Sequence, residues 1–231
     1  HTHVHSYVAS EVVALMDVVE ELGFRIHTFT HILEGYKVAD EMRAHGANAS
    51  TFADWWAFKF EAYDAVPQNA CQLMEKGLVT SINSDSNDLQ RRLNTEAAKS
   101  VRYCGMSEYE ALKMITLYPA QQLEVEEHVG SITVGKHADF VLWNAPPLSA
   151  YAKVQQTWIE GRKYFDRADD LARRSEIANE RQQLIEKVLS QGSEAHRGNS
   201  NGYRTAQPAW QCEDNHDIWR WTEFAEMEGA H

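Results

Sequence analysis

The sequence predicts an α/β fold in which a parallel sheet forms half of a (β/α)₈ barrel. In the first ~100 residues, four short β-rich segments alternate with longer amphipathic segments, which is the pattern of parallel strands joined by helices. A complete barrel needs eight such units and about 250 residues, so four units predict half of one. The alternative, an open doubly wound sheet, predicts a glycine-rich phosphate-binding turn, and the sequence contains neither GxGxxG nor GxxxxGKS/T.

Each unit is identified by its hydrophobic periodicity and by a glycine that ends its helix. In residues 9–22, apolar side chains recur at helical spacing, and Gly23 follows. Gly46, Gly77 and Gly105 follow the other three helical segments in the same way. Strands are expected at residues 1–6, 24–30, 49–52 and 79–83, and helices at residues 9–22, 36–44, 67–76 and 88–103.

A second set of elements follows these units. Residues 106–117 predict a helix with Ser107 at its N-cap and Glu110 at capping-box spacing. Short β-rich runs, separated by glycines, then predict a small appended sheet. After this sheet we expect a charged helix and then a linker rich in Gly, Ser, Asn and Gln. The runs are 130–136, 138–143 and 154–161, the helix is 168–190, the linker is 191–208 and an irregular end covers 210–231. The expected domains are 1–122, 123–166 and 167–231.

The composition excludes several classes of partner. The chain has 231 residues and a net charge of −12, whereas nucleic acid and anionic membranes bind basic surfaces. No apolar run reaches about 18 residues, so no transmembrane helix is expected. Residues 1–5 lack the basic and apolar regions of a signal peptide, and no initiator Met is present. We expect a soluble chain whose natural N-terminus lies upstream, and its compartment stays open.

The three cysteines give no sign of a shared site. Cys71, Cys104 and Cys212 are far apart in the sequence and odd in number. They form neither a CxxC metal motif nor a recognisable disulfide framework. We expect Cys71 and Cys104 to be buried free thiols.

Three chemically active residues share one structural position, the carboxyl end of a predicted strand. His5, His31 and Asp85 each end or follow such a strand, and in a barrel these ends converge on the face that carries the active site. Two imidazoles and a carboxylate suit a cation such as Zn²⁺, and Asp85 could act as general acid and base. Alternatively, each histidine is a hydrogen-bonded structural residue and Asp85 belongs to a helix N-cap region.

The remaining histidines are assigned lesser roles. His1 and His3 alternate with His5 and face the same side of the strand, and His3 is the second choice as ligand. We expect His27 to be structural or to support a ligand. The others, which fall in predicted loops or at helix ends, are expected to be solvated: His45, His128, His137, His196, His216 and His231.

Further residues are candidates for contact with substrate or for support of the ligands. Trp55 belongs to an aromatic group that forms either core packing or a pocket wall, and the group also contains Trp56, Phe58, Phe60 and Tyr63. Arg91, beside Arg92, could bind a substrate carboxylate or lie on a solvated helix face. His3 and Tyr7 complete these candidates.

The chain resembles the metal-dependent amidohydrolases, in particular their imidazolonepropionase-like branch. The matching segments are residues 3–7 (HVHSY), 31–40 (HILEGYKVAD), 52–57 (FADWWA), 82–86 (INSDS), 93–99 (LNTEAAK), 116–120 (TLYPA) and 129–141 (VGSITVGKHADFV). The last segment, with its GS-x3-GK-x-AD pattern, is the most specific. The resemblance covers about residues 1–166 and is weaker in the remainder.

This resemblance implies a (β/α)₈ barrel with one or two divalent metal ions, for which Zn²⁺ is our first choice. It also implies a small β-sandwich, built from both chain ends, to which residues 123–166 contribute. His5 and His31 then correspond to ligands on the fifth and sixth strands, and Asp85 to the acid and base on the eighth strand. The implied reaction is hydrolysis of an amide, cyclic amide or peptide-like C–N bond in a small-molecule amide or dipeptide substrate.

The family's first-strand His-x-His pair and its fourth-strand ligand have no counterpart in the sequence. We therefore expect a fragment of a longer protein, or a chain that needs a complementary chain to close its barrel and cover its sheet edges. Three functions stay open: a general C–N hydrolase, a metal-dependent dipeptidase of the Xaa-Pro or Xaa-Arg type, and a non-catalytic half barrel that only associates with a partner.

Overall fold

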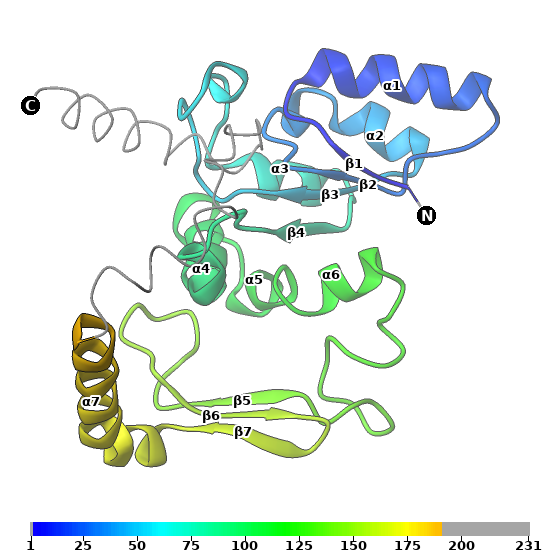
Figure 1. The fold of residues 1–231 in the computed structure, drawn as a ribbon. Helices are drawn as coiled ribbons and strands as arrows, with labels where there is room; N and C mark the ends of the chain where they lie inside the picture. The colour runs from blue at the N-terminus through cyan, green and yellow to red at the C-terminus, as the bar shows by residue number, and fades with distance from the viewer. Residues whose placement is uncertain (1, 191–231) are drawn as a thin grey trace, which may run out of the picture. The chain divides into compact units, whose positions relative to one another are not determined.

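The computed structural model describes residues 2–190 and divides the chain into two compact units, one ending at Arg167 and one beginning at Ala168. The first unit contains a four-stranded and a three-stranded sheet (Figure 1). In the described residues, no helix is both long and apolar enough to cross a membrane. The domain boundary expected after residue 122 stays a prediction.

The four-stranded sheet is parallel and follows chain order. Its strands are β1 (His3–His5), β2 (Thr28–Thr30), β3 (Asn48–Thr51) and β4 (Thr80–Ile82). Each strand pairs with the next, so that His5 aligns with Thr30, Thr30 with Ser50 and Ser50 with Ser81. The predicted α/β class is confirmed, with strands shorter than the sequence patterns suggested.

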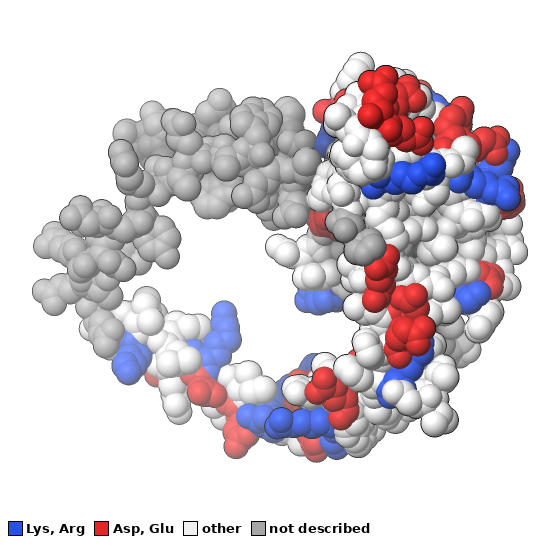
Figure 2. All heavy atoms as spheres, turned by 90° about the vertical axis from the view of Figure 1, so that its right-hand side faces the viewer, with Lys and Arg blue, Asp and Glu red and all other residues white. Residues whose placement is uncertain are grey.

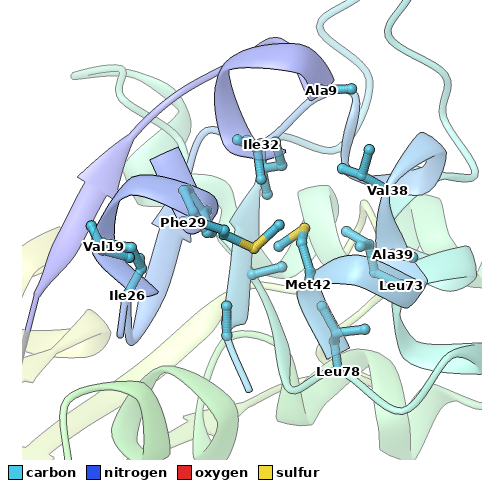
Figure 3. Close-up of a cluster of buried hydrophobic side chains, with 14 residues drawn as sticks. Ala9, Val19, Ile26, Phe29, Ile32, Val38, Ala39, Met42, Leu73 and Leu78 are labelled. Carbon is cyan, nitrogen blue, oxygen red and sulfur yellow. The ribbon is translucent and has the colours of Figure 1, made fainter. Parts of the chain in front are cut away.

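A helix follows each of these strands, and the first carries the apolar face that its periodicity predicted. The helices are α1 (Ala9–Glu21), α2 (Ala39–His45), α3 (Asn69–Glu75) and α4 (Leu93–Cys104), with 3₁₀ turns η1 (Gly35–Lys37), η2 (Phe60–Ala62) and η3 (Leu89–Arg92). Val12 and Met16 of α1 pack with Phe29 of β2, Met42 of α2 and Leu73 of α3 in one buried cluster (Figure 3). Because each helix returns to the same sheet, this cluster fixes the position of the strand ends.

The helix predicted at residues 106–117 is shorter, as α5 (Glu108–Lys113), and a separate helix that was not predicted, α6 (Leu117–Gln122), follows it. The predicted cap is confirmed, since the Glu110 amide donates to Ser107 Oγ at 3.1 Å. Pro119 explains why the two helices are separate. It has no N–H to continue a helix and is tolerated only in a first turn, so the chain begins a new helix at Leu117.

The outer edge of β4 is partly covered by these two helices. The Ile82 amide donates to the Met114 carbonyl at 3.0 Å. The buried Gln122 side chain donates to the carbonyls of Ala49 and Val79 and accepts from Ser81 Oγ. The Ile82 bond satisfies an amide that an unpaired strand edge would leave open.

The small sheet is antiparallel and consists of β5 (Phe140–Trp143), β6 (Val154–Ile159) and β7 (Arg162–Asp166). The strand expected at 130–136 is not formed, because that segment turns at Gly130 and Gly135 and leaves its apolar side chains exposed. Strand β7 was not predicted. Glu160 and Gly161, both with positive φ, join β6 to β7 in a two-residue turn of the kind that favours hairpins.

The described part of the second unit, residues 168–190, lies in the charged helix α7 (Arg167–Ser190), which begins one residue before the predicted start. The predicted linker and irregular end lie outside the described residues, as do Cys212, His196, His216 and His231. On the face drawn in Figure 2, acidic and basic side chains are interspersed, and the basic ones form no continuous patch there.

Two expectations about buried residues were wrong. Cys71 of α3 and Cys104 of α4 form a disulfide, with Cα atoms 6.5 Å apart, instead of two free thiols. Helices of successive strand–helix units lie side by side, which brings the two cysteines together across 33 residues of sequence. His45 is buried rather than solvated. Its Nε2 accepts from the Ile26 amide at 2.9 Å, and its Nδ1 lies 2.6 Å from Glu20 Oε1.

Candidate active site

The structure brings His5, His31 and Asp85 together at the carboxyl edge of the parallel sheet. His5 is the last residue of β1, His31 directly follows β2 and Asp85 lies in the loop after β4. Nε2 of His31 lies 2.9 Å from Nδ1 of His5 and 3.1 Å from Oδ2 of Asp85. Three side chains from distant parts of the sequence therefore meet at one imidazole nitrogen.

The backbone at this cluster adopts an uncommon conformation. His31 has φ 63° and Asp85 has φ 44°, both in the left-handed region that side chains with a Cβ rarely occupy. Such conformations cost free energy, and they are found preferentially where a side chain must be aimed at a functional site. At both positions this conformation belongs to a residue whose side chain reaches the cluster.

Burial determines the charge of His31. Its side chain is 1% exposed. Burial, together with the nearby His5 and Lys59, lowers the pKa of His31 to about 4. The imidazole is therefore neutral at pH 7, the form in which histidine offers a lone pair to a metal ion.

Asn83 holds the other nitrogen of this ring. Its Nδ2 lies 3.0 Å from Nδ1 of His31, and its Oδ1 is buried without a hydrogen-bond partner. In the observed orientation the amide donates to Nδ1, which places the imidazole proton on Nε2, toward Asp85 and His5. If the Asn83 amide turned over, the orphaned Oδ1 would accept from Nδ1–H and leave Nε2 free to bind a cation, as in many metal sites.

The donor set fits a zinc ion in its chemistry, since two imidazoles and a carboxylate are common zinc ligands. Ligand atoms of a tetrahedral zinc lie about 3.3 Å apart, so the observed separations of 2.9 and 3.1 Å are short by only a few tenths of an ångström. No group of three or more His, Cys, Asp or Glu side chains within residues 2–190 is already spaced to hold a metal ion. The metal centre stays a prediction.

Aromatic rings line the cluster. The rings of Tyr7 and Phe52 lie nearly parallel to the His31 imidazole, with centroids 5.8 and 5.0 Å away, and Trp55 stacks on Phe52 at 4.3 Å. Phe58 packs edge-on against Trp55. The predicted aromatic group is thus divided: Trp55 and Phe58 support the cluster, whereas three members are largely exposed, namely Trp56, Phe60 and Tyr63.

Two ion pairs of Lys99 hold the segment that carries these rings. Nζ of Lys99, on α4, lies 2.7 Å from Oδ1 of Asp54 and 3.0 Å from a carboxylate oxygen of Glu96. Burial works to lower the pKa of Lys99, but the hydrogen bonds that it donates to Asp54 and Glu96, together with their negative charges, outweigh burial and raise the pKa. The ammonium stays charged and ties the loop after β3 to α4.

Two of the predicted residues lie away from the cluster. His3 is exposed, and its ring contacts His27 at a centroid distance of 5.6 Å. Arg91 is exposed and pairs with Asp88 one turn earlier, so a solvated helix face describes it better than a substrate contact. Sequence reasoning missed Asn83, Phe52 and Lys59, whose positions depend on how the loops fold and not on a motif.

Comparison with known proteins identifies one family. The model of the amidohydrolase family matches residues 68–163. The amidohydrolase tasK of Hapsidospora irregularis is 32% identical over 171 residues, which are 72% of this chain and 17% of tasK. An imidazolonepropionase of Picrophilus torridus is 30% identical over 106 residues, 42% of this chain and 27% of that protein. The chain thus spans well under half of either relative.

Solved structures show the same fold. An amidohydrolase from Thermotoga maritima superimposes with a TM-score of 0.66 at 25% identity, covering 71% of this chain and 43% of that one. A zinc-bound adenosine deaminase from Xanthomonas campestris superimposes with a TM-score of 0.52 at 19% identity, covering 80% of this chain and 50% of that one. The latter likeness concerns the fold alone.

Proposed function

Because the chain belongs to the amidohydrolase superfamily, we propose that it provides half of the active site of a metal-dependent hydrolase of C–N bonds in small amide substrates. The observation that carries the proposal is the convergence of His5, His31 and Asp85 at the carboxyl edge of the sheet. Such an edge is where (β/α)₈ enzymes place their catalytic groups.

In this proposal, His5, His31 and Asp85 hold a divalent cation, with zinc as the first choice. When bound, the cation polarises the substrate carbonyl and acidifies a water molecule. Nε2 of His31 is the central donor because both other groups lie within hydrogen-bond reach of it. Asn83 fixes the plane of the imidazole, and Tyr7 and Phe52 keep water away from it.

Asp85 is the proposed proton carrier. Its side chain is 21% exposed, so it can reach both the cluster and a substrate, unlike the fully buried His31. As general base its carboxylate takes a proton from the attacking water, and as general acid it returns the proton to the leaving nitrogen. Hydrolysis then yields a carboxylic acid and an amine.

We propose that β1 to β4 are strands five to eight of the barrel and that residues 123–166 belong to a small β-sandwich. The other four strands, with the remaining ligands, come from a further part of the polypeptide or from a complementary chain. The parallel order β1-β2-β3-β4 supports this arrangement. The relatives support it too, since the chain spans 17% of one and 43% of a superimposed structure.

The test is metal analysis and a hydrolysis screen on the full-length protein. The screen covers dipeptides, N-acyl amino acids and cyclic amides, which separates a dipeptidase from a lactam hydrolase. Metal is expected in stoichiometric amount and is lost with activity in His31→Ala. His3→Ala is the matched control, because this exposed histidine of the same strand lies outside the cluster. Neither metal nor hydrolysis in the full-length protein would instead favour a non-catalytic half barrel.

A further inference from the structure

Lys59 is a positively charged residue beside the His5–His31–Asp85 cluster that the proposed chemistry does not use. It lies in the loop between β3 and α3, and its side chain is half-buried. Its Nζ lies 3.8 Å from the centroid of the Tyr7 ring and 5.6 Å from that of Phe58. The ammonium therefore rests on the aromatic wall of the candidate site.

This ammonium has no carboxylate partner within residues 2–190, although acidic residues are plentiful in the chain. The two aspartates of the same loop are both engaged: Asp54 binds Lys99 at 2.7 Å, and Asp64 binds Lys37 at 2.6 Å. With a net charge of −12, the sequence has ample acid to neutralise a structural lysine. Glu61 of the same loop is exposed, and no ion pair joins it to Lys59.

The aromatic contact compensates for only part of the hydration that Lys59 loses. A ring face attracts an ammonium ion, but it accepts no conventional hydrogen bond, and an ammonium has three donors. An ammonium on a half-buried side chain binds an anion more strongly than a fully solvated one does, because less water must be displaced. The aromatic contact site of Lys59 thus suits a negatively charged group.

The position of Lys59 also determines which part of a substrate it meets. Tyr7 bridges the two features, since one ring carries Lys59 and stacks on His31, the central donor of the cluster. A group bound by Lys59 therefore lies close to the cluster, as the carboxylate of an amino-acid residue lies close to its own scissile amide.

We propose that Lys59 binds the carboxylate of the substrate, so that the substrates are dipeptides or N-acyl amino acids with a free carboxylate and not neutral amides. This rests on the proposed hydrolase function and narrows its substrate class. Lys59 takes the role that the sequence suggested for Arg91, whose guanidinium is already paired with Asp88. It is a specificity-determining residue and takes no part in proton transfer.

Kinetics of the full-length protein on a dipeptide and on its C-terminal carboxamide test the proposal. Lys59→Met keeps the apolar stem and removes the charge. It is expected to raise KM about 10- to 100-fold for the dipeptide, as the loss of a charged hydrogen bond does, with kcat and the carboxamide kinetics little changed. Lys59→Arg should restore most of the KM. Lys76→Met, which removes an exposed lysine paired with Asp40, should leave both substrates unaffected.

Binding of a non-hydrolysable ketomethylene analogue, as acid and as carboxamide, gives a readout that does not depend on turnover. Weaker binding of the acid alone in Lys59→Met supports the carboxylate site even where hydrolysis is not detected. An equal effect of Lys59→Met on acid and carboxamide, or no effect on either, overturns the proposal. Wild-type hydrolysis of carboxamides as efficiently as of acids also overturns it while leaving the hydrolase function standing.

Discussion

His31 and Asp85 approach to 3.1 Å, between Nε2 and Oδ2, and both do so from a left-handed backbone conformation. Neither residue is a glycine, so each position maintains a conformation that most side chains avoid. His31 directly follows β2 and Asp85 lies in the loop after β4, so the contact between their side chains depends on the backbone conformation of these two segments.

Replacing Asp85 by Asn tests its role in proton transfer while keeping its backbone conformation. Asparagine has the same shape and tolerates the left-handed region, but it cannot accept a proton. We expect kcat of the full-length enzyme to fall by about 10²- to 10⁴-fold, with the thermal midpoint nearly unchanged. Unchanged kcat in Asp85→Asn would show that another group carries the proton. Asp85→Ala, which also loses the tolerance for this backbone, should unfold at lower temperature than Asp85→Asn.

The buried state of His31 predicts a pH dependence of stability in chelator-treated protein. Its pKa is lowered from 6.5 in the unfolded chain to about 4 in the folded one, mainly by burial. Between these values the unfolded state binds the proton more tightly, so stability is complete above pH 6.5 and is lost as pH falls through 4. The loss attributable to His31 is about 3 kcal/mol. Urea unfolding from pH 7 to 4 measures it, and His31→Gln should flatten this slope.

The disulfide between Cys71 and Cys104 predicts a dependence on reductant. It closes a loop that contains β4, Asn83 and Asp85, and it restrains the unfolded chain. Reduction is expected to lower the free energy of unfolding by about 3–4 kcal/mol, which denaturant titration with and without dithiothreitol measures. The double variant Cys71→Ser/Cys104→Ser should have the free energy of unfolding of the reduced protein, and this free energy should not depend on the reductant. A wild type that is equally stable in both conditions contradicts the expectation.

The sequence predicted the features that depend on local pattern. Gly46 and Gly105 end α2 and α4 in the left-handed conformation, and Ser107 caps α5, as their spacing indicated. The convergence of His5, His31 and Asp85 followed from one topological rule, that the carboxyl ends of parallel strands share an edge. These inferences needed no knowledge of how distant loops fold.

The sequence pattern could not predict contacts between residues that lie far apart in the sequence. His45 was expected in solvent because it ends a helix, yet it is buried and hydrogen-bonded to Glu20 and to the Ile26 amide, which are distant in the sequence. Cys71 and Cys104 meet only because α3 and α4 pack side by side. Lys59 reaches Tyr7 across 52 residues of sequence through a loop whose path has no periodicity.

The hydrogen bond between Asn83 and His31 predicts a role for Asn83 in metal affinity. Asn83 contacts the ring nitrogen opposite the one that faces His5 and Asp85, so it sets both the tautomer and the plane of the imidazole. Partners of this kind contribute about 10- to 100-fold to metal affinity. Asn83→Ala should therefore weaken zinc binding to the full-length protein by that factor in a competitive chelator titration. Asn94→Ala, which removes an amide bonded to the Pro147 carbonyl, is the matched control and should bind zinc as the wild type does. Equal zinc affinity in Asn83→Ala and the wild type would mean that the aromatic rings of Tyr7 and Phe52 suffice to orient His31.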